Sequence, residues 1–281
     1  MFPLHNNQYL RNISSQTGGN GPSPAIWQPV EAAIMQLGGV ERATVHFDDF
    51  DNFGGAVSSN VGNKQGYKTW EDSGGSIDQL TGVNGGVVRF LTDNTDNDSN
   101  TMQGGYSTGA LGAISDTAGD DYLTAFECSC RFTQIGNTYG WVVGLGEPGM
   151  AADAGVQADD GTLVTDKGMI GFRVLETAGA TLQAFYIKSG QTAVAWTFKT
   201  LVAATWYKFG FLYNPKFPTA NRIKFFLDGA EQSTYVTGTQ IAAATFPDAV
   251  FMHLLASLKN QTSAVESVDM GFWGYAQVGI S

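Results

Sequence analysis

Apolar and polar residues alternate with a period of two over much of this chain, which is typical of β-strands that bury one face. The clearest alternation lies in residues 206–213, where four aromatic side chains share one face: Tyr207, Phe209, Phe211 and Tyr213. Residues 223–227 alternate in the same way, and the connection between the two segments contains Pro215 and Pro218, which have no N–H for a strand ladder. These features predict a β-hairpin. Trp206, which opens it, is expected to be buried between two sheets.

The same alternation predicts strands along the rest of the chain. In residues 122–132 the apolar positions, among them Phe126 and Phe132, face the core, while Glu127 and Arg131 face away. About ten or more such segments, separated by turn residues at intervals of roughly 8–12 residues, leave almost no room for helices. The sequence therefore predicts an all-β fold, a sandwich of two antiparallel sheets.

The N-terminal part of the chain has a different pattern. Residues 1 to about 25 are polar and rich in Gly, Asn and Ser, so they cannot bury enough apolar surface to fold alone and are expected to form an arm. Val30, Ile34 and Leu37 follow at helical spacing before Gly38, which predicts one short helix. Two interpretations of this helix stay open. It closes one end of the sandwich, or it docks with the arm on a neighbouring subunit.

Length and composition fit one large β-domain. With 281 residues, 36 Gly, 18 Phe and only 15% charged residues, the chain suits many short strands, tight turns and an aromatic core. We expect an N-terminal arm and short helix in residues 1–42, followed by a single β-sandwich domain in residues 43–281.

The net charge and the lack of apolar targeting segments limit the classes of partner that we expect. Lys and Arg total 15 against 26 Asp and Glu, and no basic stripe is present to neutralise phosphates, so we expect no nucleic-acid partner. No segment approaches the ~20 apolar residues of a membrane span, and the N-terminus lacks the basic and apolar regions of a signal peptide. A protein made in the cytoplasm, with no membrane partner, is expected.

The chain contains 2 cysteines, Cys128 and Cys130, two positions apart in a predicted strand. Their side chains point to the same face, and a disulfide between them would strain the backbone. No further ligand residue is near them in the sequence, so we interpret them as buried thiols without a metal or redox role.

The most polar run of the chain contains a candidate metal site. Asp96, Asp98 and Asn100 alternate as oxygen ligands do in calcium loops. The EF-hand pattern also needs Gly at its sixth position and Glu at its twelfth, where this chain has Thr101 and Ser107. An EF-hand is therefore excluded, and a solvated surface loop is favoured over a looser calcium site. No other cofactor is predicted.

Two segments carry a family resemblance. In the hairpin, Trp206 opens an apolar strand, a Pro/Asn loop follows, and the second strand closes on Leu227, Asp228 and Gly229. Residues 265–275 have the alternation of a closing strand. Together they resemble concanavalin A-like and laminin G-like jelly rolls, in which the last strand returns beside the first. The resemblance implies a jelly-roll sandwich and implies little about activity, because these folds host many functions.

The most specific enzyme of that fold class, a laminarinase-type glucanase, delivers its carboxylates from one strand as Glu-x-Asp-x-x-Glu. The chain has no such motif, and the odd spacing of its nearest pair, Glu266 and Asp269, puts them on opposite faces of a strand. The 3 histidines, His5, His46 and His253, lie far apart in the sequence and accompany no nucleophile elbow or metal cluster. We therefore expect no enzymatic activity.

Carbohydrate binding is an alternative function that the aromatic residues suggest. Exposed aromatic rings stack on sugar faces, and Asp and Asn side chains in loops bind hydroxyl groups. Trp70 and Trp141 are the candidate glycan-stacking residues, with Trp196 and Trp273 as further platforms. For each of them, burial in the core or at an interface is the competing interpretation.

The function that we favour from the sequence rests on a second resemblance. Residues 169–174, 184–186, 201–211 and 246–251 resemble segments of structural proteins of tailed phages. Together with the arm, the acidic composition and the missing catalytic motif, this resemblance implies a non-enzymatic virion protein. We expect a capsid decoration or cement protein that binds the major capsid protein or other virion proteins, located in the virion as a homo-oligomer. A carbohydrate-binding, lectin-like module is the alternative.

Overall fold

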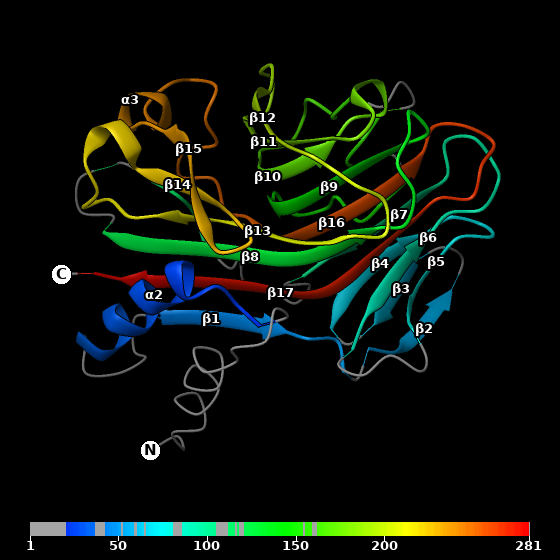
Figure 1. Ribbon diagram of the computed structural model, residues 1–281, viewed down its shortest axis with the longest axis horizontal. Helices are drawn as coiled ribbons and strands as arrows, with labels where there is room; N and C mark the ends of the chain where they lie inside the picture. Colours follow the sequence, from blue (N-terminus) through cyan, green and yellow to red (C-terminus); the bar gives the residue numbers. More distant parts are fainter. Residues whose placement is uncertain are drawn as a thin grey trace.

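The computed structural model describes residues 21–36, 43–51, 53–58, 61–64, 66–80, 86–104, 112–115, 117, 121–153, 155–158 and 162–280. Within them the chain forms two antiparallel sheets that pack face to face, as Figure 1 shows. The predicted all-β sandwich is confirmed. We call the eight-stranded sheet sheet A and the nine-stranded one sheet B.

Sheet A is centred on two long strands, β8 and β17. In spatial order its strands are β15 (Ala230–Val236), β14 (Ile223–Leu227), β13 (Trp206–Tyr213), β8 (Tyr122–Phe132), β17 (Ser267–Gly279), β6 (Val88–Leu91) and β5 (Ser76–Gln79), and β1 (Ala43–Asp48) also pairs with β17. Since β17 pairs with β1, the closing strand returns beside the first strand, as the jelly-roll resemblance implied.

Sheet B runs in the order β12 (Val194–Thr200), β11 (Thr181–Ile187), β10 (Met169–Val174), β9 (Tyr139–Gly146), β16 (His253–Asn260), β7 (Ser99–Gln103), β4 (Tyr67–Glu71), β3 (Val61–Lys64) and β2 (Gly55–Ser58). The helical elements are α2 (Pro24–Gln36), the short α3 (Gly238–Ile241), which the sequence analysis missed, and single 3-10 turns at Glu176–Ala178 and Thr219–Asn221. Within the described ranges no helix is long and apolar enough to cross a membrane.

The core lies between the two sheets. The four aromatic residues of β13 face it, as predicted: Tyr207, Phe209, Phe211 and Tyr213. Across the interface, the ring of Phe172 in β10 packs against Phe209 with centroids 4.9 Å apart. Cys128 and Cys130 face the same core from β8 as buried free thiols, which is how the sequence was interpreted.

Trp206 lies in the predicted hairpin but is not buried as expected. Because its neighbour Tyr207 faces the core, Trp206 faces outward, and 36% of it is exposed. Its ring lies over Gly271 of β17, where an added Cβ atom would come within 3.3 Å of the indole. The prediction that Trp206 is buried between the sheets is therefore wrong, since the other aromatic rings of the strand already take the inner face.

Helix α2 lies on the outer face of sheet A, beneath β8 and β17 in Figure 1. Ile26, Val30 and Ile34 pack there against outward-facing apolar side chains of the sheet, which include Leu123, Ala125, Leu212, Ala276 and Val278. The interpretation that the helix closes one end of the sandwich is wrong, because its apolar stripe meets a sheet face. Docking on a neighbouring subunit stays a prediction, and residues 1–20 of the predicted arm lie outside the described residues.

A buried carboxylate ties α2 to the sheet. Glu127 faces outward from β8, as predicted, yet it is only 1% exposed because the helix covers it. Its Oε2 atom accepts hydrogen bonds from the backbone N–H of Ser23 and from Nε1 of Trp27, both at 2.8 Å. Burial raises the pKa of Glu127, and these two donors oppose that shift. The contact is therefore specific as well as apolar.

Strand β17 contains a β-bulge. Between Met270 and Phe272 its register with β8 shifts by one residue, so Gly271 has no partner. Met270 and Trp273 consequently both face the core although they are an odd number of positions apart. Asp269, next to Met270, faces outward from the segment before the bulge.

Candidate functional site

The tryptophans that were proposed as glycan platforms lie in different places. Trp141 and Trp273 are fully buried between the sheets, and Trp141 packs edge-on against Phe90 with ring centroids 5.1 Å apart. Trp196 is half-buried and packs against the same core. The proposal that Trp141 stacks on a glycan is therefore wrong, since solvent does not reach its ring. Trp70 is half-buried on the outer face of sheet B.

Strand pairing places polar side chains beside Trp70. In the sheet register Trp70 of β4 is opposite Thr101 of β7, and Thr101 is opposite Ser257 of β16. One step along the strands, Ser99 is opposite Lys259, and Lys259 is opposite Gly140 of β9. Residues of one row share a sheet face, so these side chains form a continuous patch.

Gln157 completes this patch from a loop. Its side chain lies over Gly140, where an added Cβ atom would come within 1.7 Å of Oε1. We call Trp70, Ser99, Thr101, Gln157, Ser257 and Lys259 the polar face.

Several groups of the polar face lack the hydrogen bonds that burial normally requires. The hydroxyls of Thr101 and Ser257 pair with each other at 2.9 Å. In contrast, within the part of the chain that the structure describes, Oγ of Ser99 and both amide atoms of Gln157 are buried without a partner, at 2% and 1% exposure. Nε1 of Trp70 is also buried and unpaired. A buried group without a partner costs on the order of 1–3 kcal/mol of stability unless a ligand or water supplies the bond.

Residues 147–168 hold Gln157 in place. The side chain of Gln103 accepts from the backbone N–H groups of Gly149 and Met150, and it donates to the carbonyl of Glu147. Nζ of Lys259 lies 3.3 Å from the carbonyl oxygen of Gln157. The loop also contributes Met150, Val156 and Leu163 to an apolar cluster on the outer face of sheet B. It is therefore a fixed cover over this part of the sheet.

The structure does not bring the three candidate calcium ligands together. Asp96 is exposed, whereas Asn100 is buried and donates through Nδ2 to the carbonyl of Leu91. Asn100 shares the inner face of β7 with Met102. Among the described residues no group of three or more His, Cys, Asp or Glu side chains is placed to hold a metal ion.

Asp98, predicted as a calcium ligand, is hydrogen-bonded to the carboxylate of Asp93. Burial, a hydrogen bond to Asp93 and the charges of Asp93 and Asp72 raise the pKa of Asp98 to about 7. The same hydrogen bond lowers the pKa of Asp93. The two carboxylates therefore share one proton below neutral pH, which suits a neutral carboxyl group better than a cation ligand.

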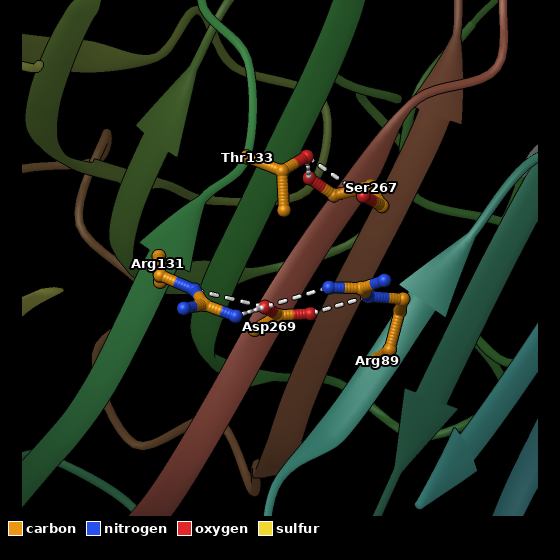
Figure 2. A network of polar contacts seen from close by, with 5 residues as sticks. All are labelled: Arg89, Arg131, Thr133, Ser267 and Asp269. Atoms are coloured by element: carbon orange, nitrogen blue, oxygen red, sulfur yellow. Dashed lines mark hydrogen bonds and ion pairs between the residues drawn. The ribbon is translucent and has the colours of Figure 1, made fainter. Parts of the chain in front are cut away.

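The nearest pair to a glucanase motif does not form a shared site. Asp269 is fully buried on the outer face of sheet A, and Figure 2 shows it between the guanidinium groups of Arg89 and Arg131. Glu266 precedes β17 and accepts a hydrogen bond from Nε2 of Gln134. Asp269 is thus an ion-pair residue, and nothing in this arrangement pairs it with Glu266 across a substrate.

The sequence analysis missed most of the polar face. Ser99, Thr101, Ser257 and Gln157 come from two strands and a loop that are far apart in the chain, so only the strand order brings them together. One signal was available. Ser257 and Lys259 stand at alternate positions after a run of apolar residues, and this spacing indicates polar positions on the outer face.

Comparison with known proteins supports the fold. No protein-family model matches the chain, and no curated protein sequence matches it. A solved structure of a protein of unknown function from Shewanella oneidensis MR-1 aligns with a TM-score of 0.52 and 14% identity, covering 85% of this chain and 89% of that chain. Peanut lectin aligns with a TM-score of 0.50 and 11% identity, covering 85% and 99%.

A β-glucanase from Bacillus licheniformis aligns with a TM-score of only 0.46 at 13% identity, over 82% of this chain and 97% of that chain. These neighbours share the concanavalin A-like jelly roll, and at such identities the likeness extends to the fold alone. A likeness in fold alone does not decide whether the chain is an enzyme.

Proposed function

We propose that this protein is a carbohydrate-binding, lectin-like module that holds a glycan on the polar face of sheet B. The observation that carries the proposal is the unpaired amide of Gln157 and hydroxyl of Ser99 on the same face as the half-buried ring of Trp70. Such groups are expected where a ligand or ordered water supplies the missing hydrogen bonds.

The chemistry of this face suits a sugar. Hydroxyl groups of a sugar both donate and accept, and the Gln157 amide offers one donor group and one acceptor group. The exposed part of Trp70 excludes its N–H, so solvent reaches the apolar ring, which can stack on the C–H face of a pyranose. From β4 to β9 the face spans three strand spacings, about 14 Å, which fits a short oligosaccharide.

Access to the face begins at Trp70. Val61 of β3, its cross-strand neighbour, is 42% exposed, so this side of the face is open to solvent. Ser99, Thr101, Ser257 and Gln157 are each no more than 2% exposed, so a glycan reaches them only when neighbouring side chains shift. The proposal therefore predicts that Trp70 binds the first sugar and that the covered residues contribute to specificity. That peanut lectin has the same fold is compatible with this arrangement.

A glycan array with wild-type protein and a Trp70→Ala variant tests the proposal. We expect the wild-type protein to bind a defined set of neutral glycans and Trp70→Ala to lose about tenfold or more of that affinity. Trp206→Ala is the matched control, because it removes an exposed tryptophan from the opposite sheet. An array without signal, or equal loss in both variants, would contradict the proposal.

The virion role stays a prediction, together with a capsid partner, homo-oligomerisation and localisation in the virion. Electron microscopy of tailed-phage heads incubated with the protein tests it directly. Ordered protein density on the head surface is the expected result, and bare heads at saturating protein would argue against decoration.

A further inference from the structure

A cluster with excess positive charge lies on the outer face of sheet A. In the sheet register Trp206 is opposite Arg131, Arg131 is opposite Asp269, and Asp269 is opposite Arg89. Figure 2 shows the two guanidinium groups on either side of the single carboxylate. One negative charge between two positive charges leaves one positive charge uncompensated within the cluster.

Asp269 uses only part of the donor capacity of the two arginines. Arg89 donates through Nε at 2.7 Å and through Nη2 at 3.0 Å, and Arg131 donates through Nε at 3.0 Å and through Nη2 at 2.5 Å. A guanidinium group has five N–H donors, so each arginine keeps three. In the described part of the chain neither arginine has another hydrogen-bond partner, and their side chains are 32% and 31% exposed.

The cluster is also rigid. Asp269 is 0% exposed and fixes both guanidinium planes from below, so the remaining N–H groups already point in defined directions. A ligand that binds them loses little additional side-chain entropy. The neighbouring carboxylate, Asp78, is opposite Arg89 in the register, but it forms its ion pair with Lys64 at 2.9 Å. Lys64 is also ion-paired with Glu71 at 3.0 Å, so Asp78 keeps part of its negative charge beside Arg89, although no hydrogen bond joins Asp78 to Arg89 among the described residues.

Trp206 adds an aromatic surface beside the donors. Its ring centroid lies 5.2 Å from Cζ of Arg131, and its ring rests on the backbone at Gly271. The guanidinium of Arg131 lies over the ring, and at 36% exposure part of the ring stays accessible to solvent. A ligand that combines a carboxylate with an apolar ring face can use both parts at once: the guanidinium donors for the carboxylate and the indole for the ring.

We propose that Arg89, Arg131 and Trp206 form a second binding site, specific for acidic sugars, in which a uronic acid carboxylate binds the free guanidinium N–H groups and the sugar ring stacks on Trp206. The site lies on the opposite sheet from the polar face, so it does not depend on the function proposed above. Because the whole chain carries a net charge of −11, long-range attraction cannot drive this binding. The contacts are short-range and exposed, and salt weakens them.

Isothermal titration of the full chain with trigalacturonate, and separately with its methyl ester, tests the proposal. The ester has the same rings without the charge. We expect trigalacturonate to bind, the ester to bind at least tenfold more weakly, and Arg89→Gln and Trp206→Ala each to lose about tenfold or more of the affinity for trigalacturonate. Lys224→Gln, which removes a half-buried lysine from β14 of the same sheet, and Trp70→Ala are controls that should keep it.

Three outcomes would overturn the inference: no binding of trigalacturonate by the wild-type protein, equal binding of acid and ester, or full affinity in Arg89→Gln. Arg89→Gln leaves Arg131 paired with Asp269, and a thermal melt confirms that the variant is folded. If it is not, Trp206→Ala and the ester comparison decide. Loss of neutral-glycan binding in Trp70→Ala with intact trigalacturonate binding would separate the two sites.

Discussion

The outer face of each sheet is covered in part by a chain segment, but the buried polar groups on the two faces differ in their hydrogen bonding. On sheet A, helix α2 covers Glu127 and supplies two donors to its carboxylate. On sheet B, Oγ of Ser99 and the side-chain amide of Gln157, a residue of the covering loop, are buried without a partner among the described residues. The first cover adds stability and specificity to the fold. The second lowers stability and leaves hydrogen-bonding capacity free, which is the usual sign of a binding site.

Glu127→Ala should have the largest effect on stability. The substitution leaves the N–H groups of Ser23 and Trp27 buried without an acceptor, so we expect a loss of about 2–5 kcal/mol in the free energy of unfolding. Urea denaturation measures it. Glu231→Ala, which removes an exposed carboxylate paired with Lys224, is the control and should change stability by less than about 1 kcal/mol. A similar, small effect in both variants would mean that the helix is held by apolar contact alone.

Gln157→Met should act in the opposite direction. Replacing an unpaired buried amide with an apolar side chain of similar shape removes a desolvation cost, so we expect a gain of about 1–2 kcal/mol. The same variant should bind the glycan more weakly. Denaturation and binding are measured on one preparation. A loss of stability would show that Gln157 is hydrogen-bonded in solution and would remove the contrast between the two covers.

Trp206→Ala should cost only about 1 kcal/mol, because the ring is partly exposed and its contact with Arg131 is that of an exposed cation–π pair. Trp273→Ala, at a fully buried position of the same sheet, should cost about 3–5 kcal/mol. Melting temperatures of the two variants measured side by side check this order. Equal costs would mean that the outer face near Trp206 is covered in solution.

Asp98 gives a smaller, pH-dependent effect. Its pKa of about 7 in the folded protein lies above the ~3.9 of an unfolded chain, so folding takes up a proton in between. The stabilisation is complete below pH ~4 and is lost as the pH rises to about 7. The lowered pKa of Asp93 acts in the opposite sense, at more acidic pH. Melting curves of wild-type protein should show this decline between pH 4 and 7, and Asp98→Asn should flatten it.

The sequence predicted those parts of the structure that depend on local alternation. The strands around Phe126 and Phe209, the hairpin and the buried thiols all follow from a period of two within one segment. The placement of α2 could not be predicted in this way. Its apolar stripe shows that it packs on something, but the receiving surface combines side chains from β8, β13 and β17.

The same limit explains the results for the candidate site. Trp70 and Trp141 look alike in the sequence, since both stand in alternating segments, and only the order of strands in sheet B and the inner or outer face of each strand distinguishes them. Asp96, Asp98 and Asn100 follow a ligand-like spacing, but a regular strand begins at Ser99 and turns Asn100 inward. Function at this site depends on contacts between distant segments, which a pattern within one segment does not contain.

The bulge at Gly271 changes which residues of strand β17 face outward. Before the bulge, odd-numbered residues such as Asp269 face outward, and after it even-numbered residues such as Ala276 do. The first part of β17 therefore presents Asp269 to the arginine cluster, and the second part presents apolar side chains to α2. Deleting Gly271 would remove the bulge and restore a regular alternation through this part of the strand. Either Asp269 or Trp273 would then lie on the wrong side of the sheet. Changes in length between these two residues are therefore tolerated only in steps of two, and a single-residue deletion there should put one end of β17 out of register on both faces of sheet A while leaving the other end in register.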